Sequence, residues 1–437
     1  MGTALTAQRE LDLGLQSARQ PVRRPPPERS LPDELGAFCE FGAATVCTVT
    51  HGRSFDGQPV EVPTFVNEFW TARQRQASSL HEISYRACFK PQLPRFFIER
   101  LSEPGTVVYD PFMGRGTTPL EAALLGRVPF GNDVNPLSTV LTRPRLAPPE
   151  PQAVAERLAG VAWDDHDEFP EDLLAFYHPD TLRQITALKK QLLARRTRGE
   201  SDGVDDWITM VAINRLTGHS VGFFSVYTLP PNQATSVKAQ RRINERRRQV
   251  PPPRDVPAII LRKSRQLLRD CDAATRRELA GVAARARLLT GPAEATPSIP
   301  DGSVSLVVTS PPFLNVVQYA TDNWLRCWFL GLDASQLRIS MPSGLEKWQG
   351  IMSSVFRELH RVLRPGGHVA FEVGEVHSGA TKLEDAVLPC GIAANLRPLL
   401  IQIQSQEFTK TANCWGVGNN AKGTNTNRIV VFRKEPA

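Results

Sequence analysis

The hydrophobic pattern of this 437-residue chain alternates between short apolar runs and longer stretches with helical spacing. Buried strands are predicted where β-branched and apolar residues cluster, at 105–110, 128–131, 304–309, 368–373, 399–404 and 428–432. Helices are predicted where apolar residues recur every three or four positions, at 94–101, 117–125, 182–193, 207–216 and 355–363. A hairpin within 38–62 and a strand at 222–227 are predicted from shorter apolar pieces.

Changes in composition divide the chain into three parts. Residues 1–34 are polar and rich in proline and arginine, which predicts a flexible N-terminal tail. Residues 35–141 and 286–437 carry the strand and helix pattern and are predicted to form one catalytic domain. Residues 142–285 interrupt that pattern with helical segments and are predicted to be an inserted, mainly helical region.

The inserted region is strongly basic toward its end. Residues 238–287 contain 15 Lys and Arg but only 5 Asp and Glu, whereas the whole chain has a net charge of +7. A solvated helix face normally mixes the two signs, so this excess predicts contact with a phosphate backbone. The candidate DNA-binding residues are Arg241, Arg242, Arg246, Arg247 and Arg248.

Two further features of the composition limit the class of protein. No run of 18 apolar residues occurs, so a membrane-spanning helix is not expected. The seven cysteines are odd in number and have neither a CxxC nor a zinc-like spacing. Reduced thiols, no metal site and a cytoplasmic location are therefore predicted.

A candidate nucleotide site follows the strand at 105–110. The sequence D-P-F-M-G-R-G-T-T at 110–118 comes between a strand and a helix, and G-N-D-V-N-P at 131–136 follows the next strand. Glycines allow the backbone to approach a ligand closely, and a helix N-terminus has free N–H groups. Asp133 lies about 20 residues beyond the glycines, where a carboxylate can accept both ribose hydroxyls. This combination predicts a Rossmann-type nucleotide site.

The strand at 304–309 ends in a second candidate site, Ser310-Pro311-Pro312-Phe313. Two prolines must end the ladder and stiffen the chain. Alone, such a segment is more often an ordinary turn. The nucleotide half-site and the basic insertion favour a functional role, in which Ser310 and the Pro311 carbonyl accept hydrogen bonds and Phe313 offers a ring face.

Together with L-R-P-G-G at 363–367, these motifs resemble those of the S-adenosylmethionine-dependent amino-methyltransferases of DNA. The S-P-P-F form is most similar to the N4-cytosine branch, found in restriction–modification and orphan modification enzymes. The resemblance covers about residues 80–140 and 286–435. It implies a Rossmann-like class I methyltransferase sheet with helices on both faces, in which the Asp110 strand and the Ser310 strand are neighbours. It also implies S-adenosyl-L-methionine as cofactor, double-stranded DNA as partner, and a cognate restriction endonuclease as a further candidate partner.

The resemblance also assigns roles to residues. Asp110 and the Gly114–Gly116 turn would hold the methionine end of the cofactor, and Asp133 its ribose. The segment before the first helix would touch the cofactor as well. The implied cofactor-binding set is Tyr85, Phe89, Lys90, Pro91, Asp110, Pro111, Phe112, Gly114, Gly116, Thr117, Thr118, Asp133, Asn135 and Pro136. The implied catalytic set is Ser310, Pro311, Pro312 and Phe313.

The reaction expected from these residues is methyl transfer to the N4 amine of a flipped-out cytosine. Acceptors placed on the amine hydrogens favour a pyramidal nitrogen that can attack, and Phe313 would stack on the base. Three alternatives stay open: an N6-adenine methyltransferase, an RNA amino-methyltransferase, and a catalytically inert nucleic-acid-binding protein of the same fold. The motif order, with the insertion between the cofactor and catalytic motifs, is more often linked to adenine enzymes.

Overall fold

The computed structural model describes residues 30–71, 77–86, 88–163, 168–229, 234–312, 319–334, 344–373, 375–376, 381–405 and 426–436. The main sheet has nine strands, which are β1 (Val46–Arg53), β2 (Pro59–Asn67), β3 (Val107–Asp110), β4 (Val128–Asp133), β5 (Arg287–Thr290), β6 (Val304–Thr309), β7 (Leu363–Val373), β10 (Leu396–Ser405) and β11 (Thr426–Lys434). Their spatial order is β1-β2-β10-β11-β7-β6-β3-β4-β5. A separate two-stranded ribbon pairs β8 (Glu375–Val376) with β9 (Thr381–Lys382).

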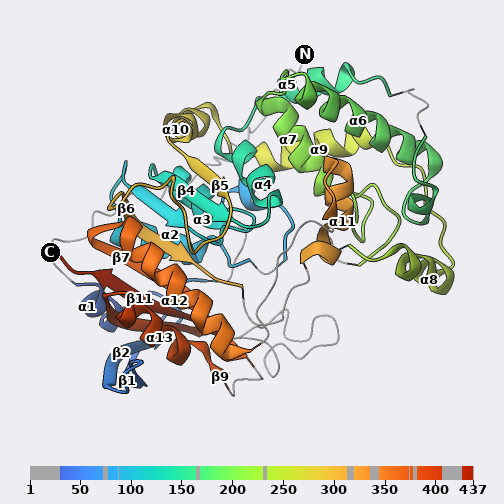
Figure 1. Cartoon of the computed structure of the whole chain (residues 1–437). Coiled ribbons are helices and arrows are strands. Elements are labelled where there is room, and N and C mark those ends of the chain that lie inside the picture. Colours follow the sequence, from blue (N-terminus) through green and yellow to red (C-terminus); the bar gives the residue numbers. More distant parts are fainter. Residues whose placement is uncertain are drawn as a thin grey trace, which may run out of the picture.

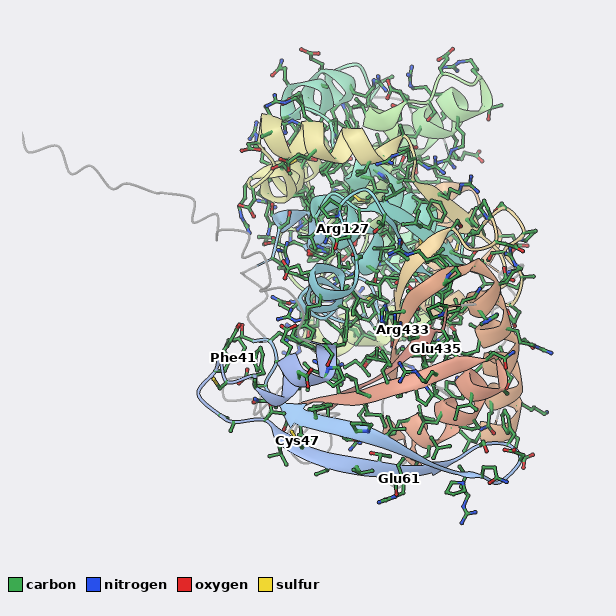
Figure 2. All side chains as sticks on the ribbon, turned by 90° about the vertical axis from the view of Figure 1, so that its left-hand side faces the viewer. Phe41, Cys47, Glu61, Arg127, Arg433 and Glu435 are labelled. Atoms are coloured by element: carbon green, nitrogen blue, oxygen red, sulfur yellow. The ribbon has the colours of Figure 1, made fainter. Side chains whose placement is uncertain are left out.

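The sheet is mixed. Strands β3 to β7 are parallel to one another, whereas β11 runs antiparallel to both of its neighbours, β7 and β10. The antiparallel hairpin of β1 and β2 continues the sheet through β2, which pairs in parallel with β10. Figure 2 shows this hairpin at the edge of the sheet, with Cys47 and Glu61 on its strands. The predicted hairpin is confirmed, although it extends to Asn67.

Helices cover both faces of the sheet. On one face lie α12 (Leu345–Val362) and α13 (Leu383–Ala393), packed against Val307 and its neighbours. On the other face lie α1 (Leu31–Gly36), α2 (Gln92–Leu101) and α3 (Thr117–Leu124), packed against Leu306 and Val308. Successive side chains of β6 point to opposite faces, so this strand is buried along its whole length.

A helical region stands beside the sheet, at the upper right of Figure 1. Its helices are α4 (Leu137–Leu146), α5 (Pro151–Ala159), α6 (Pro179–Thr197), α7 (Gly203–Ile213), α8 (Val237–Arg247), α9 (Val256–Leu268) and α11 (Tyr319–Leu330). The helix α10 (Ala273–Ala283) lies instead beside α3 and β4 of the sheet domain. A shared apolar core joins α5, α6, α7, α9 and α11 to α3 and α4, and so anchors the region to the sheet domain. The Rossmann-like sheet with helices on both faces and the helical character of the insertion are confirmed. Within the described ranges no helix is both long and apolar enough to cross a membrane.

The predicted strand at 222–227 is wrong. Residues 218–228 instead form a loop that folds back on itself, since the Gly218 N–H donates to Ser225 Oγ and the Gly218 carbonyl accepts from the Thr228 N–H. The ring of Phe223 packs directly on Gly218, where an added Cβ would lie only 2.4 Å from the ring. The apolar residues of this segment are therefore buried by loop packing rather than by strand pairing.

The packing of α13 on the sheet provides a test of the fold. A Cβ on Gly391 would lie 2.3 Å from the Phe432 ring, whereas Gly350 in α12 has open space around it. We expect Gly391→Ala to lower the free energy of unfolding by about 1–3 kcal/mol because the core must shift. Gly350→Ala should be neutral or raise it by up to about 1 kcal/mol. Urea denaturation of both variants measures this, and equal stabilities would contradict the packing.

Candidate active site at the carboxyl edge of the sheet

The two sequence motifs meet at one edge of the sheet. Val108 and Tyr109 of β3 pair in parallel with Leu306 and Val307 of β6, so Asp110 and Thr309 end neighbouring strands. This adjacency was expected from the resemblance and is confirmed, although about 200 residues separate the motifs. In open α/β sheets, ligands bind outside the carboxyl ends of the strands. The structure therefore places both half-sites where one ligand pair could reach them.

Asp110 is buried at the end of β3. Its Oδ1 accepts the Thr309 hydroxyl at 2.6 Å and the Phe112 N–H at 3.0 Å. Burial raises the pKa of Asp110 to about 7, although the hydrogen bonds from Thr309, Phe112 and Thr118 act in the opposite direction. The carboxyl is therefore poised to change its charge near neutral pH.

The glycine turn is shaped by backbone conformation and by close packing. Gly114 and Gly116 have φ angles of +50° and +76°, which other residues adopt only at a cost. A Cβ on Gly116 would lie 2.2 Å from Thr142 Oγ1, so α4 packs directly on this turn. The turn leads into α3, where the Thr118 hydroxyl donates to the Val308 carbonyl of β6 at 3.1 Å.

Asp133 holds this turn from the end of β4. The Gly114 N–H donates to its Oδ2 and the Asn135 N–H to its Oδ1, each at 2.8 Å. Burial raises the pKa of Asp133, and these two N–H groups lower it in part. The carboxyl thus stands beside the glycine turn, as a ribose-binding acid would have to.

The residues at 85–91 that the resemblance assigns to the cofactor lie partly at the site and partly in the core. Tyr85 is buried beside the site and its hydroxyl accepts from Asn135 Nδ2 at 2.9 Å. Pro136 precedes the first residue of α4, and Pro91 that of α2. Phe89 packs instead against the core between α2 and the sheet. Burial lowers the pKa of Lys90. The described contacts join Tyr85, Asn135 and Asp133 directly, and they do not include Phe89.

Buried arginines fix the backbone that carries Tyr85. Arg115 Nη1 donates to the Ile83 carbonyl at 2.9 Å, and Arg145 Nη1 to the Leu80 carbonyl at 3.3 Å. Both side chains are nearly inaccessible to solvent. The hydrogen bonds of these two guanidinium groups connect residues 80–85 to the glycine turn and to α4.

A buried acid that the sequence analysis missed completes the site. Glu372, near the end of β7, is 6% exposed, and Phe371 beside it pairs with Thr309. Burial raises the pKa of Glu372, while hydrogen bonds from the Ser310 hydroxyl and from Asn427 Nδ2, at 2.9 Å, lower it. The sequence did contain a signal for Glu372. The strand predicted at 368–373 is mostly apolar but has an acid next to its end, as the strand at 105–110 has an acid at its end.

The Pro311-Pro312 segment is held in place by a hydrogen bond from α12. Pro311 is buried, Pro312 is half-buried, and the Pro312 carbonyl accepts from Trp348 Nε1 at 3.0 Å. Phe313 lies outside the described residues. The structure therefore brings Ser310, Glu372, Asp110 and Asp133 to one edge. Among the described residues, no group of three His, Cys, Asp or Glu side chains has the arrangement of a metal site.

The predicted DNA-binding arginines lie on α8, which Figure 1 shows on the outer side of the helical region. Arg241 forms an ion pair with Asp172 at 2.5 Å, and the Arg247 guanidinium stacks 3.8 Å from the centre of the Tyr227 ring. Arg248 ends the helix in a left-handed conformation. Arg242 and Arg246 are exposed and have no partner within the described ranges. Gln240 and Asn244 anchor α8 through hydrogen bonds to backbone carbonyls.

Residues 54–137 match the model of an N6/N4 methyltransferase family described as DNA methylase. The matched segment makes up less than a fifth of the chain. It contains both acids and the glycines of the cofactor motifs and ends before Ser310.

Relatives extend the similarity at lower identity. The type II methyltransferase M.BsoBI of Geobacillus stearothermophilus is 22% identical over 303 residues, which are 64% of this chain and 58% of that protein. The type II methyltransferase M.MvaI of Kocuria varians is 33% identical over 82 residues, 18% of each protein. The chain thus aligns with less than two thirds of the length of either relative. TrmN of Thermus thermophilus is similar in structure with a TM-score of 0.32 and 13% identity, covering 83% of this chain and 52% of that one.

The raised pKa of Asp110 gives a pH dependence of stability. An unfolded aspartate titrates near pH 3.9. Between that pH and about 7 the folded protein retains a proton that the unfolded chain has released. Stability must therefore fall as pH rises through this window.

Between pH 5 and pH 7.5, we expect the free energy of unfolding of wild type to fall by about 2 kcal/mol more than that of Asp110→Asn. Urea denaturation at both pH values measures the difference from wild type. Glu346→Gln, at an exposed position of α12, serves as the control. An unchanged pH dependence in Asp110→Asn would refute the assignment.

Proposed function

We propose that this protein is a DNA methyltransferase of the N6/N4 family that transfers the methyl of S-adenosyl-L-methionine to the N4 amine of cytosine, as a type II modification enzyme in the cytoplasm. The observation that carries the proposal is the pairing of β6 with β3 and β7, which brings Asp110, Ser310 and Glu372 to one edge of the sheet. The family match and the type II relatives support DNA as the substrate. A cognate restriction endonuclease is the expected partner.

The donor set of the site fits the cofactor. Asp110 is buried and Asp133 is half-buried, both have raised pKa values, and neither pairs with a cation within the described part of the chain. A ligand with an ammonium and two hydroxyls would satisfy such acceptors. Asp110 and the Gly114–Gly116 turn would hold its methionine end, and Asp133 its ribose. When bound, S-adenosyl-L-methionine supplies an electrophilic methyl group on a positively charged sulfur.

Ser310 and Glu372 would act on the target amine. Because the Ser310 hydroxyl donates to Glu372, its oxygen lone pairs are left to accept from the amine hydrogen. The Pro311 carbonyl would accept the second hydrogen. These fixed acceptors favour the pyramidal nitrogen that attack requires. As the nitrogen loses a proton, Ser310 can take it and pass its own to Glu372, whose burial already favours protonation.

The remaining site residues would place the base and the DNA. Pro312, fixed by Trp348, keeps the loop stiff, and Phe313 would stack on the flipped base. Arg242 and Arg246 would contact phosphates, together with Arg241, Arg247 and Arg248. Adenine N6 is the second candidate acceptor, because the insertion lies between the cofactor and catalytic motifs.

Product analysis tests the proposal. The protein is incubated with duplex DNA and S-adenosyl-L-methionine carrying a deuterated methyl, and the nucleosides are identified by mass spectrometry. We expect N4-methyldeoxycytidine. N6-methyldeoxyadenosine alone would contradict the choice of base, and transfer only to RNA would contradict the substrate. Absence of both transfer and cofactor binding would indicate an inert scaffold.

Removing the hydroxyl of Ser310 should separate chemistry from binding. We expect Ser310→Ala to lower turnover by about 100-fold or more, the cost typical of losing one preorganised polar group. Its dissociation constants for DNA and cofactor should stay near those of wild type. Ser354→Ala, at a partly exposed serine of α12, is the matched control. Equal losses of turnover and of DNA affinity would contradict this role.

A further inference from the structure

A second cluster of charged groups lies in the helical region, apart from the carboxyl edge. Arg215 follows α7, and Arg262 and Lys263 lie on α9. Burial lowers the pKa of Arg215 and of Lys263. Repulsion from Arg326 and Arg262 lowers the pKa of Arg215 further, and repulsion from Arg215 lowers that of Lys263. We call Arg215, Arg262 and Lys263 the 215–263 cation cluster.

Arg215 is buried without an anionic partner. It is 9% exposed, its Nε has no hydrogen bond, and its guanidinium stacks 4.1 Å from the centre of the Phe223 ring. Phe223 is itself fixed on Gly218 by the close packing described above. The stacking holds the guanidinium in place while leaving its hydrogen-bond donors unused within the described residues.

Lys263 is also buried, at 6% exposure, and among the described residues its amine donates only to Gln266 Oε1, at 3.2 Å. Glu82, a carboxylate whose charge acts on Lys263, already accepts from Gln266 on one oxygen and from Arg269 on the other, each at 2.6 Å. Burial lowers the pKa of Lys263 to about 8, as expected for an ammonium that lacks a counter-ion. The cluster therefore carries positive charge that a bound anion would neutralise.

Arg262 makes the cluster accessible from outside. Its side chain is exposed and donates from Nη2 to the Val221 carbonyl of the 218–228 loop at 3.3 Å. This hydrogen bond joins α9 to the loop. The Arg262 guanidinium therefore lies at the surface, next to the buried Arg215 and Lys263. An anion arriving at the surface would meet Arg262 first.

The cluster borders the segment that carries Tyr85. The Ser84 N–H donates to Asn214 Oδ1 at 2.9 Å, and Asn214 precedes Arg215. The Ser84 carbonyl accepts from Arg326 Nη2 at 3.0 Å, and Arg326 lies on α11, which follows the Pro-Pro segment in sequence. A strand of DNA bound at the cluster would thus be close to both parts of the proposed active site.

We propose that the 215–263 cation cluster is a binding site for a phosphodiester group of the DNA backbone. Arginine donors fit phosphate oxygens in pairs, and a lysine ammonium adds a point charge. A bound phosphate relieves the repulsion among the three cations and supplies the missing counter-charge. The proposal rests on the proposed function insofar as DNA is taken as the substrate. It adds a phosphate contact outside α8, at the root of the helical region.

The salt dependence of duplex binding tests the site. The slope of log affinity against log salt decreases by about one for each lost phosphate contact. We expect Arg262→Gln combined with Lys263→Met to make the slope less negative by about one to two, and to lower affinity about 10-fold at low salt. Arg262→Gln alone, at an exposed position, should give a smaller change of the same sign. Arg397→Gln, near the chain's C-terminus, removes an exposed arginine from the sheet and is the matched control.

Thermal melting and cofactor titration of the same variants confirm that the fold and the cofactor site are intact. Wild-type slope and affinity in the double variant would overturn the proposal. Binding of inorganic phosphate that only wild type shows, with no change in the DNA slope, would assign the site to free phosphate and also overturn it. If the slope changes but wild type methylates no DNA, the proposed function fails and the phosphate site stands.

Discussion

The parallel pairing of β6 with both β3 and β7 is the constraint on which the site depends. Each strand brings one polar group to the same edge: Asp110 from β3, Ser310 from just beyond β6, and Glu372 from β7. Because successive residues of a strand point to opposite faces, a shift of one residue in either register would remove these contacts. The hydrogen bonds Thr309 to Asp110 and Ser310 to Glu372 fix both registers with side chains as well as backbone.

Burial then gives the edge its chemistry. Three carboxyls, Asp110, Asp133 and Glu372, lie in surroundings that raise their pKa values, so each holds a proton more readily than an exposed acid. Such carboxyls cost stability unless a ligand or neighbour satisfies them. The helical region shows the opposite case, since Arg215 and Lys263 are buried cations that form no ion pair within the described residues. The acids at the edge of the sheet would suit the positively charged cofactor of the proposed function. The cations in the insertion would suit its negatively charged nucleic acid.

Part of this arrangement could be read from the sequence. The buried strand at 304–309, the strand ending at Asp110 and the helix beginning at Thr117 follow from local apolar patterns and proline and glycine positions. The neighbouring position of β3 and β6 followed from the resemblance alone. Local pattern failed at 222–227, where the packing of Phe223 on Gly218 replaced a strand with a loop.

Other features depend on contacts between distant segments. The role of Glu372 requires the register of β6 on β7, and 62 positions separate it from Ser310. The partners of Arg241 and Arg247 lie in other segments, so the charge run could not distinguish paired from free arginines. The 215–263 cation cluster likewise joins two helices and a loop that the sequence shows only as separate basic residues.

The central claim is that Glu372 directs the Ser310 hydroxyl so that the serine oxygen accepts from the target amine. Single-turnover methylation by Glu372→Gln, with DNA and cofactor both saturating, tests it most directly. The amide keeps the size of the side chain but loses the charge that orients the hydroxyl. The account predicts a rate about 100-fold below wild type with unchanged dissociation constants for both ligands. A wild-type rate in Glu372→Gln would contradict it.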